Sequence, residues 1–152
     1  MLKGEKMTEK TCAMDTRDLV VLLADLAEQI DMLIGKKGTL SVFRYAGKQM
    51  GKRLGAGQTG DAELARNLVA KFFKDKEFMD DILLNQQAAE LQGCRIGLVL
   101  KERGIPAGTH ALCNFGFGLI DGVTESVTGK KIITLHVDSK YHEHGITCQE
   151  TW

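Results

Sequence analysis

Apolar residues recur at three- and four-residue steps in the N-terminal half of the chain, which is the spacing of amphipathic helices. The first such stretch follows Asp15 and Thr16, either of which can cap a helix, and it ends at Gly35. Its apolar positions are Leu19, Leu22, Leu23, Leu26, Ile30 and Leu33, widened by Val20, Ala27 and Ile34. A stripe this wide predicts a helix that is buried on two sides, and a second subunit could cover one of them.

A second helix is predicted from Thr39 to Leu54, where glycine recurs every four residues at Gly47, Gly51 and Gly55. Each glycine destabilises a helix by about 1 kcal/mol relative to alanine. The repeat therefore indicates that another backbone or a ligand comes close to this face. Of the two, we favour a close helix crossing.

Two further helices are predicted before residue 85. One begins at Asp61 and carries Leu64, Leu68, Val69, Phe72 and Phe73 on its apolar side. The other is short and spans Glu77 to Leu84. Up to this point the pattern predicts a layer of helices.

The pattern changes after Asn85. An apolar run bounded by glycines within residues 88–102, centred on Ile96 to Leu100, predicts a strand. A helix follows from the turn at Pro106 to about Val127. Ile133, Leu135 and Val137 then alternate with polar residues, as in a half-buried strand, and Ile146 to Trp152 returns as a hairpin partner.

This order of elements predicts an α+β fold. An N-terminal helical layer packs on a small antiparallel sheet, with a C-terminal helix and hairpin. Residues 1–14 are expected to form a flexible tail and residues 15–152 a single domain, since 152 residues suffice for one core.

Composition and charge narrow the function classes. Lysine plus arginine and aspartate plus glutamate number 20 each, so no global field attracts nucleic acid. No apolar run approaches the roughly 18 residues of a membrane span, and the N-terminus lacks the apolar core of a signal peptide. We therefore expect a cytoplasmic protein with reduced thiols, no nucleic-acid partner and no membrane span.

The segment from His110 to Trp152 holds all four histidines and two of the four cysteines. Its candidate metal ligands are Cys113, His136, Asp138, His142, His144 and Cys148. Thiolate, imidazole and carboxylate are ligands that zinc prefers. His136 and Asp138 are expected on one face of their strand, with Cys148 brought near by the hairpin. The alternative is that the histidines are simply solvated near a turn.

Sequence signatures of common enzymes are missing, including the P-loop, the Gly-x-Ser-x-Gly elbow and the His-Glu-x-x-His pair. A cysteine activated by a neighbouring histidine stays open as a catalytic alternative, with Cys113 or Cys148 as the nucleophile. The six phenylalanines (Phe43, Phe72, Phe73, Phe78, Phe115 and Phe117) indicate either an apolar ligand cavity or a filled core. From the residues alone, a filled core is favoured.

Three stretches resemble the 4-vinyl reductase (hydrocarbon-binding) domain. They are RYAGKQMGKRLG (Arg44 to Gly55), the Cys113-x-Phe-x-x-Gly-x-Ile-x-Gly spacing through Gly122, and the closing Asp138, Gly145, Cys148 run. The resemblance covers about residues 40 to 152. The domain belongs to a group that includes trafficking-complex subunits and sensor domains of aromatic-responsive regulators.

The resemblance implies dimerisation through the helical layer and a pocket for a small molecule or an acyl chain. In the regulator branch it also implies zinc, held by a helix cysteine, a strand acid and two hairpin cysteines. Cys113, Asp138 and Cys148 match three of these positions, while Tyr141 stands where the other hairpin cysteine would be. His142 or His144 could replace that ligand.

From these features we expect a non-catalytic binding or sensor domain for a hydrophobic, aromatic or hydrocarbon ligand. The expected ligand contacts are Phe43, Phe72, Phe115 and Phe117, and the expected assembly is a homodimer. A structural zinc site at Cys113, Asp138, His142, His144 and Cys148 accompanies this expectation. The alternatives are a dimeric assembly module of the trafficking-subunit type and a reductase accessory protein.

Overall fold

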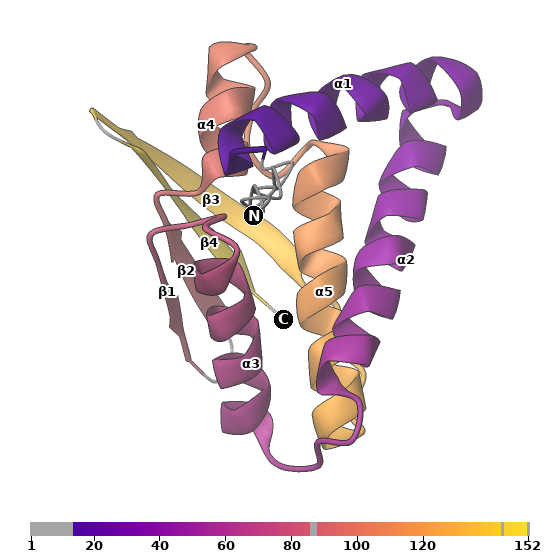
Figure 1. Ribbon diagram of the computed structural model, residues 1–152, viewed down its shortest axis with the longest axis vertical. Helices are drawn as coiled ribbons and strands as arrows, with labels where there is room; N and C mark the ends of the chain where they lie inside the picture. The colour runs from indigo at the N-terminus through magenta and orange to yellow at the C-terminus, as the bar shows by residue number, and fades with distance from the viewer. Residues whose placement is uncertain (1–13, 86–87, 144, 152) are drawn as a thin grey trace, which may run out of the picture.

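The computed structural model describes residues 14–85, 88–143 and 145–151. Within these residues the chain forms five helices and four strands (Figure 1). The helices are α1 (Thr16–Ile34), α2 (Lys36–Gly55), α3 (Ala62–Asp75), α4 (Arg95–Glu102) and α5 (Ala111–Thr128). The strands are β1 (Asp81–Leu84), β2 (Ala88–Gln92), β3 (Leu135–His142) and β4 (Gly145–Thr151). The predicted α+β class is confirmed, whereas nearly all of the predicted tail lies outside the described residues.

The four strands form one antiparallel sheet in the order β1-β2-β4-β3. The face of this sheet that carries Ile82, Leu91 and Ile146 is buried. Helix α3 packs on β1 and on α5, and α2 runs alongside α5 on its other side (Figure 1). Helix α1 crosses the ends of α2, α4 and α5. Helix α5 therefore occupies the centre of the fold.

Asp15 and Asp61 cap α1 and α3 as the sequence predicts, whereas α2 begins at Lys36 and not at the predicted Thr39. The Asp15 carboxylate accepts a hydrogen bond from the Asp18 amide at 2.8 Å, and Asp61 does the same for Leu64 at 3.0 Å. Gly35 separates α1 from α2 with a φ of 79°, a left-handed value that favours glycine. His110 caps α5, where its Nδ1 accepts from the Leu112 amide at 3.1 Å.

Between residues 77 and 102 two predictions are wrong. Residues 81–84, expected to end a short helix, form strand β1, and the segment expected as one strand forms β2 followed by α4. Glu77, with a φ of 57°, turns the chain out of the helical conformation. In α4 the run Ile96, Val99, Leu100 has helical spacing. Apolar runs of four or five residues do not distinguish the two periodicities.

The glycine repeat of α2 produces a close crossing with α5, as we favoured. A Cβ added at Gly47 or Gly51 would collide with backbone atoms of α5, chiefly the carbonyl oxygens of Phe115 and Leu119. Helix α5 contributes glycines of its own at Gly118 and Gly122, where a Cβ would strike carbonyl oxygens of α2. The two backbones therefore touch along this face, and only glycine permits that approach.

An ion pair between half-buried Arg44 and buried Asp121 joins the same crossing to the segment before β3. The Arg44 guanidinium donates to the Asp121 carboxylate at 2.7 Å and to the Thr134 carbonyl oxygen at 2.8 Å. The other oxygen of Asp121 accepts from the Thr134 amide and hydroxyl at 2.8 and 2.7 Å. Both carboxylate oxygens are thus satisfied. The network fixes the chain just before β3 against α2 and α5.

In the part of the chain that the structure describes, no helix combines the length and the apolar character needed to cross a bilayer.

Candidate ligand-binding site

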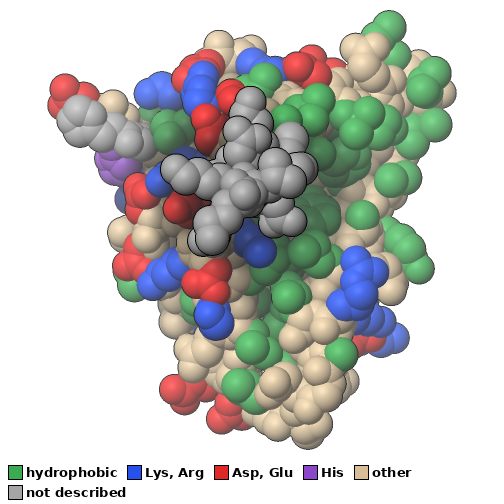
Figure 2. Space-filling view, viewed as in Figure 1, with side chains coloured by type: hydrophobic (Ala, Val, Ile, Leu, Met, Phe, Trp, Pro, Cys, Tyr) green, Lys and Arg blue, Asp and Glu red, His purple; other side chains and the backbone are tan. Residues whose placement is uncertain are grey.

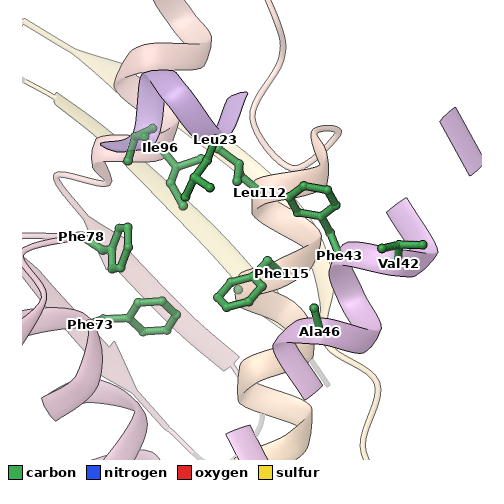
Figure 3. A pocket seen from close by; sticks show the side chains of 11 residues that line it. Leu23, Val42, Phe43, Ala46, Phe73, Phe78, Ile96, Leu112 and Phe115 are labelled. Carbon is green, nitrogen blue, oxygen red and sulfur yellow. The ribbon is translucent and has the colours of Figure 1, made fainter. Parts of the chain in front are cut away.

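An apolar cavity of about 320 Å³ lies among α1, α2, α3 and α5 (Figure 3). Helix α1 contributes Val20 and Leu23, α2 contributes Phe43 and Ala46, and α5 contributes Phe115. Apart from Gly116, every residue that lines it has a hydrocarbon side chain. Figure 2 shows apolar side chains gathered in a hollow on this face of the molecule. We call this space the apolar cavity.

Two of the four predicted ligand residues, Phe43 and Phe115, line the apolar cavity. Phe72 does not, because it points into the core, where its ring lies edge-on to Phe73 with 5.6 Å between centroids. Phe73 and Phe78 line the apolar cavity instead (Figure 3). Neighbouring residues of a helix point about 100° apart, so the direction of each ring depends on how the helix is rotated.

Phe117, the fourth predicted residue, lies on the other side of α5. Its ring stacks on the imidazole of His136 with 6.5 Å between centroids, and the Arg44 guanidinium lies 5.9 Å from the ring centre. Phe117 therefore belongs to the packing between α5 and β3. It also forms part of the wall of a second, smaller cavity.

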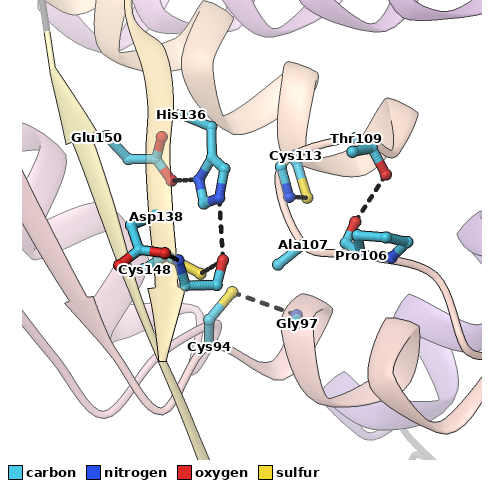
Figure 4. Close-up of polar contacts among 12 residues, drawn as sticks. Cys94, Gly97, Pro106, Ala107, Thr109, Cys113, His136, Asp138, Cys148 and Glu150 are labelled. Carbon is cyan, nitrogen blue, oxygen red and sulfur yellow. Dashed lines mark hydrogen bonds and ion pairs between the residues drawn. The ribbon is translucent and has the colours of Figure 1, made fainter. Parts of the chain in front are cut away.

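The second cavity has a volume of about 40 Å³, and we call it the inner cavity. It shares Phe73, Ile96, Leu112 and Gly116 with the apolar cavity, so the two spaces adjoin. Its remaining wall is different in kind, because it includes Cys94, Cys113, Cys148 and Glu150 (Figure 4). The apolar cavity therefore adjoins a small space with polarizable and acidic groups.

Burial keeps the thiols of the inner cavity protonated. It raises the pKa of Cys113 to about 12 and the pKa of Cys148 to about 12, because a thiolate loses its hydration there. Burial also raises the pKa of Cys94. Since the thiolate is the reactive form of cysteine, none of these thiols is activated as a nucleophile at neutral pH.

A chain of polar contacts runs along the sheet beside the inner cavity. Oε1 of Glu150 lies 2.9 Å from Nδ1 of His136, and Nε2 of His136 lies 2.9 Å from Oγ of Ser139. The Ser139 hydroxyl in turn lies 3.8 Å from the Cys148 sulfur (Figure 4). The order acid, imidazole, hydroxyl matches a catalytic relay, but Ser139 lines neither cavity. These contacts therefore form a polar network along the sheet, beside the inner cavity.

The protonation of this network follows from burial. The Glu150 side chain is 2% exposed, and desolvation raises its pKa to about 8. Desolvation lowers the pKa of His136. At neutral pH the Glu150 carboxyl is therefore protonated and the His136 imidazole is neutral. Oε2 of Glu150 is buried and has no hydrogen-bond partner among the described residues.

The predicted metal ligands are separated by a bulge in β3. His136 pairs with Glu150 across the hairpin and Asp138 pairs with Gln149, with an irregularity between them. Ser139 consequently faces the same side as His136 and Cys148, while Asp138 is exposed on the other face. The expectation that His136 and Asp138 share a face is therefore wrong, because one extra residue reverses the alternation.

The other proposed ligands are also divided between the two faces. Cys113 and Cys148 line the inner cavity, whereas Asp138 and His142 border a groove on the outer face of the sheet. His142 is engaged there with the Thr147 hydroxyl at 3.0 Å. His144 lies outside the described residues. Across residues 14–85, 88–143 and 145–151, no three acidic, cysteine or histidine residues gather as a metal site, and a zinc site that includes His144 stays a prediction.

The network of Glu150, His136 and Ser139 was not predicted from the sequence. One signal was present: Ile146, Cys148 and Glu150 alternate at period two with polar residues, which places Glu150 on the buried face of its strand. A buried acid at such a position calls for a partner. The bulge that brings Ser139 to His136 has no comparable signal.

The chain matches no protein-family model, and its comparison with curated proteins yields no significant match. The fold and the cavities define an α+β domain with an apolar hollow between helices. The resemblance to the 4-vinyl reductase domain remains a prediction from the sequence motifs.

Proposed function

We propose that this protein binds a small apolar molecule in the apolar cavity and serves as a non-catalytic binding or sensor domain. The supporting observation is the cavity itself, a hollow open to the surface and lined by hydrocarbon side chains (Figure 2). An engineered cavity of about 150 Å³ binds benzene. The apolar cavity, at about 320 Å³, has room for a two-ring aromatic molecule or a short alkyl chain.

Ligand binding would act on the position of α1. Val20 and Leu23 of α1 face Phe115 of α5 across the cavity, so a ligand contacts both helices at once. Arg17 joins α1 to α4 through an exposed pair with Glu102, and such pairs contribute little stability. Arg103, which follows α4, is half-buried and pairs with both Asp25 and Glu28 of α1. A ligand that binds only the folded protein, with α1 against the cavity, stabilises that position of α1 by mass action.

The test is a titration with the uncharged fluorescent dye N-phenyl-1-naphthylamine. We expect saturation at one dye per chain. Ala46→Trp places an indole at the cavity wall and should weaken binding at least tenfold. Ala62→Trp, at an exposed position of α3 away from the cavity, is the matched control and should bind as the wild type does. If the wild-type protein shows no saturable binding of the dye, the proposal is wrong.

A second role, as a homodimeric assembly module, is favoured by a separate observation. Large apolar side chains lie exposed along α1 and at the start of α2, including Leu22 (52%), Leu26 (51%), Leu33 (83%), Val42 (50%) and Tyr45 (66%). Exposed apolar patches of this kind mark protein interfaces. We propose that a second copy of the chain covers them.

Sedimentation equilibrium distinguishes this second role. We expect a dimer for the wild-type protein and a monomer for Leu22→Glu/Leu26→Glu. Leu83→Glu, which changes a comparably exposed leucine (53%) on the sheet, should remain dimeric. A wild-type monomer at all concentrations removes the assembly role and leaves ligand binding untouched.

A further inference from the structure

The apolar cavity opens to the surface on the side of α1 and α2. Val42 and Ala46 of α2 line the cavity, yet both side chains are exposed, Val42 by 50%. Leu23 of α1, which also lines it, is half-buried. Phe73 and Leu112, by contrast, are buried (Figure 3). An apolar ligand in the cavity would therefore stay in contact with water beside Val42 and Ala46.

The exposed leucines of α1 form one row beside this opening. Leu19, Leu22, Leu26 and Leu33 are 37%, 52%, 51% and 83% exposed. At 100° per residue they fall within an arc of about 60° on the helix, next to Leu23, which lines the cavity. We call these four residues the leucine row. Figure 2 shows apolar side chains continuing from this helix into the hollow, so the row and the cavity wall belong to one apolar surface.

The charges of α1 lie outside the leucine row and are mainly acidic. The helix carries four acidic residues and one cation, namely Asp18, Asp25, Glu28, Asp31 and Arg17. At 100° per residue none of them falls within the arc of the row. Acidic surface repels both nucleic acid and an anionic membrane. The chemistry of the row therefore suits a partner surface that is itself uncharged and apolar.

The exposed apolar surface is large enough to contribute most of a dimer interface. Besides the leucine row, Ile34, Val42 and Tyr45 are 53%, 50% and 66% exposed. Together these side chains present several hundred Å² of apolar surface, and a standard interface buries about 800 Å² on each partner. A twofold axis brings the same surface of two copies together. An uncharged apolar row then meets an identical row, so a second copy of the chain supplies the partner that the surface requires.

We infer that the second copy closes the apolar cavity, so that the complete ligand site exists only in the dimer. This inference rests on the proposed function and joins its two roles, because the surface that carries the interface also carries the opening. The second copy covers Val42 and Ala46 with apolar side chains and excludes water from the ligand. Ligand binding and dimerisation are then linked, since each favours the other by the same factor.

Sedimentation equilibrium with and without saturating N-phenyl-1-naphthylamine tests this linkage. A dimer that binds the dye at least tenfold more tightly than the monomer, at one site on each copy, has its dissociation constant lowered at least hundredfold by the dye, because the two binding steps multiply. We expect that decrease for the wild-type protein. A smaller decrease overturns the inference.

A variant remote from the opening separates closure from local damage to the site. Leu33 lies about 15 Å along the helix from Leu23 and does not line the cavity. At a concentration at which the wild-type protein is dimeric, Leu33→Glu should be monomeric, bind the dye at least tenfold more weakly, and become dimeric at saturating dye. Leu83→Glu, which changes an exposed leucine on the sheet, is the matched control and should behave as the wild type does. A monomeric Leu33→Glu with wild-type affinity for the dye overturns the inference.

Failure of the inference is distinguishable from failure of the proposed function. If the dye does not bind the wild-type protein at any concentration, ligand binding fails and the inference fails with it. If the wild-type protein binds the dye but stays monomeric, the inference is wrong and ligand binding stands. Cosedimentation of that monomer with phosphatidylcholine vesicles would then assign the apolar surface to a membrane. If Leu33→Glu and Leu22→Glu/Leu26→Glu both remain dimeric, the interface lies elsewhere and the inference is overturned.

Discussion

Helix α5 meets its neighbours in two opposite ways. Toward α2, glycines on both helices remove every side chain between the backbones, and the carbonyl oxygens of one helix lie where a Cβ of the other would be. Toward α1 and α3, Phe115 and Gly116 border the apolar cavity instead. One side of the helix is packed without space for a methyl group, and the other leaves about 320 Å³.

The two buried acids show the same difference. Asp121, on the α2 side, has both oxygens hydrogen-bonded by Arg44 and Thr134. Glu150, beside the inner cavity, has one oxygen bonded to His136 and one without a partner among the described residues. Satisfied polar groups and close packing hold a structure together, while an apolar hollow suits a ligand. The contrast supports the proposal that one side of α5 stabilises the fold and the other binds a ligand.

Truncating the two phenylalanines on either side of Gly116 gives the largest expected loss of stability. Phe117→Ala removes a 6% exposed ring packed on Arg44 and His136, and should lower the free energy of unfolding by about 4 kcal/mol. Phe115→Ala removes a half-buried ring that already borders empty space, and should lower it by only about 2 kcal/mol. Urea denaturation followed by circular dichroism measures both. Equal losses would contradict the division of α5 into a packed side and an open side.

Substituting the two glycines next to these rings should change stability by less than Phe117→Ala does, and in opposite directions. Gly118→Ala forces a methyl group against the Arg44 carbonyl oxygen and should destabilise the fold by about 3 kcal/mol. Gly116→Ala meets only the Phe73 ring at 3.8 Å, and the helix propensity of alanine should stabilise it by up to about 1 kcal/mol. The same denaturation experiment applies. Destabilisation by Gly116→Ala as large as by Gly118→Ala would show that both sides are closely packed.

The packing of α5 against α2 was the part of the structure best predicted from the sequence. The four-residue glycine repeat from Gly47 to Gly55 favoured a close helix crossing, and the apolar stripes located the long helices, so the crossing and the starts of α1 and α3 were predicted. The segment from residue 77 to 102 was not, because its apolar runs are too short to show a period. Their conformation depends on pairing with β4 and packing against α3.

The open side was predicted only in part. That phenylalanines of different helices meet was foreseeable, but which ring enters the cavity depends on a rotation of about 100° between neighbours, and Phe73 took the place assigned to Phe72. The bulge after His136 moved Asp138 to the outer face and Ser139 to the inner one. A one-residue irregularity of pairing leaves no trace in an alternating sequence, and it decided which residues surround Glu150.

The pH dependence of stability gives the smallest expected effect and concerns Glu150 alone. Burial raises the pKa of Glu150 from 4.5 to about 8, so between pH 6.5 and 8 the folded protein holds a proton that the unfolded chain has lost. The free energy of unfolding should therefore fall as pH rises through this window, by about 1–2 kcal/mol. Below pH 6.5 the lowered pKa values of His110 and His136 act in the opposite direction, since the unfolded chain then binds protons that the folded state excludes.

Glu150→Gln, which cannot titrate, tests this assignment. Urea denaturation at pH 6.5, 7.0, 7.5 and 8.0 should give a falling free energy of unfolding for the wild-type protein and a nearly constant one for the variant. The thiols do not interfere, because the ordinary pKa of cysteine is 9.0 and burial raises the values of Cys113 and Cys148 further. A slope that persists in Glu150→Gln would mean that the Glu150 carboxyl is already ionised and stabilised in the fold. Glu150 would then resemble Asp121, and the difference between the two sides of α5 would reduce to packing alone.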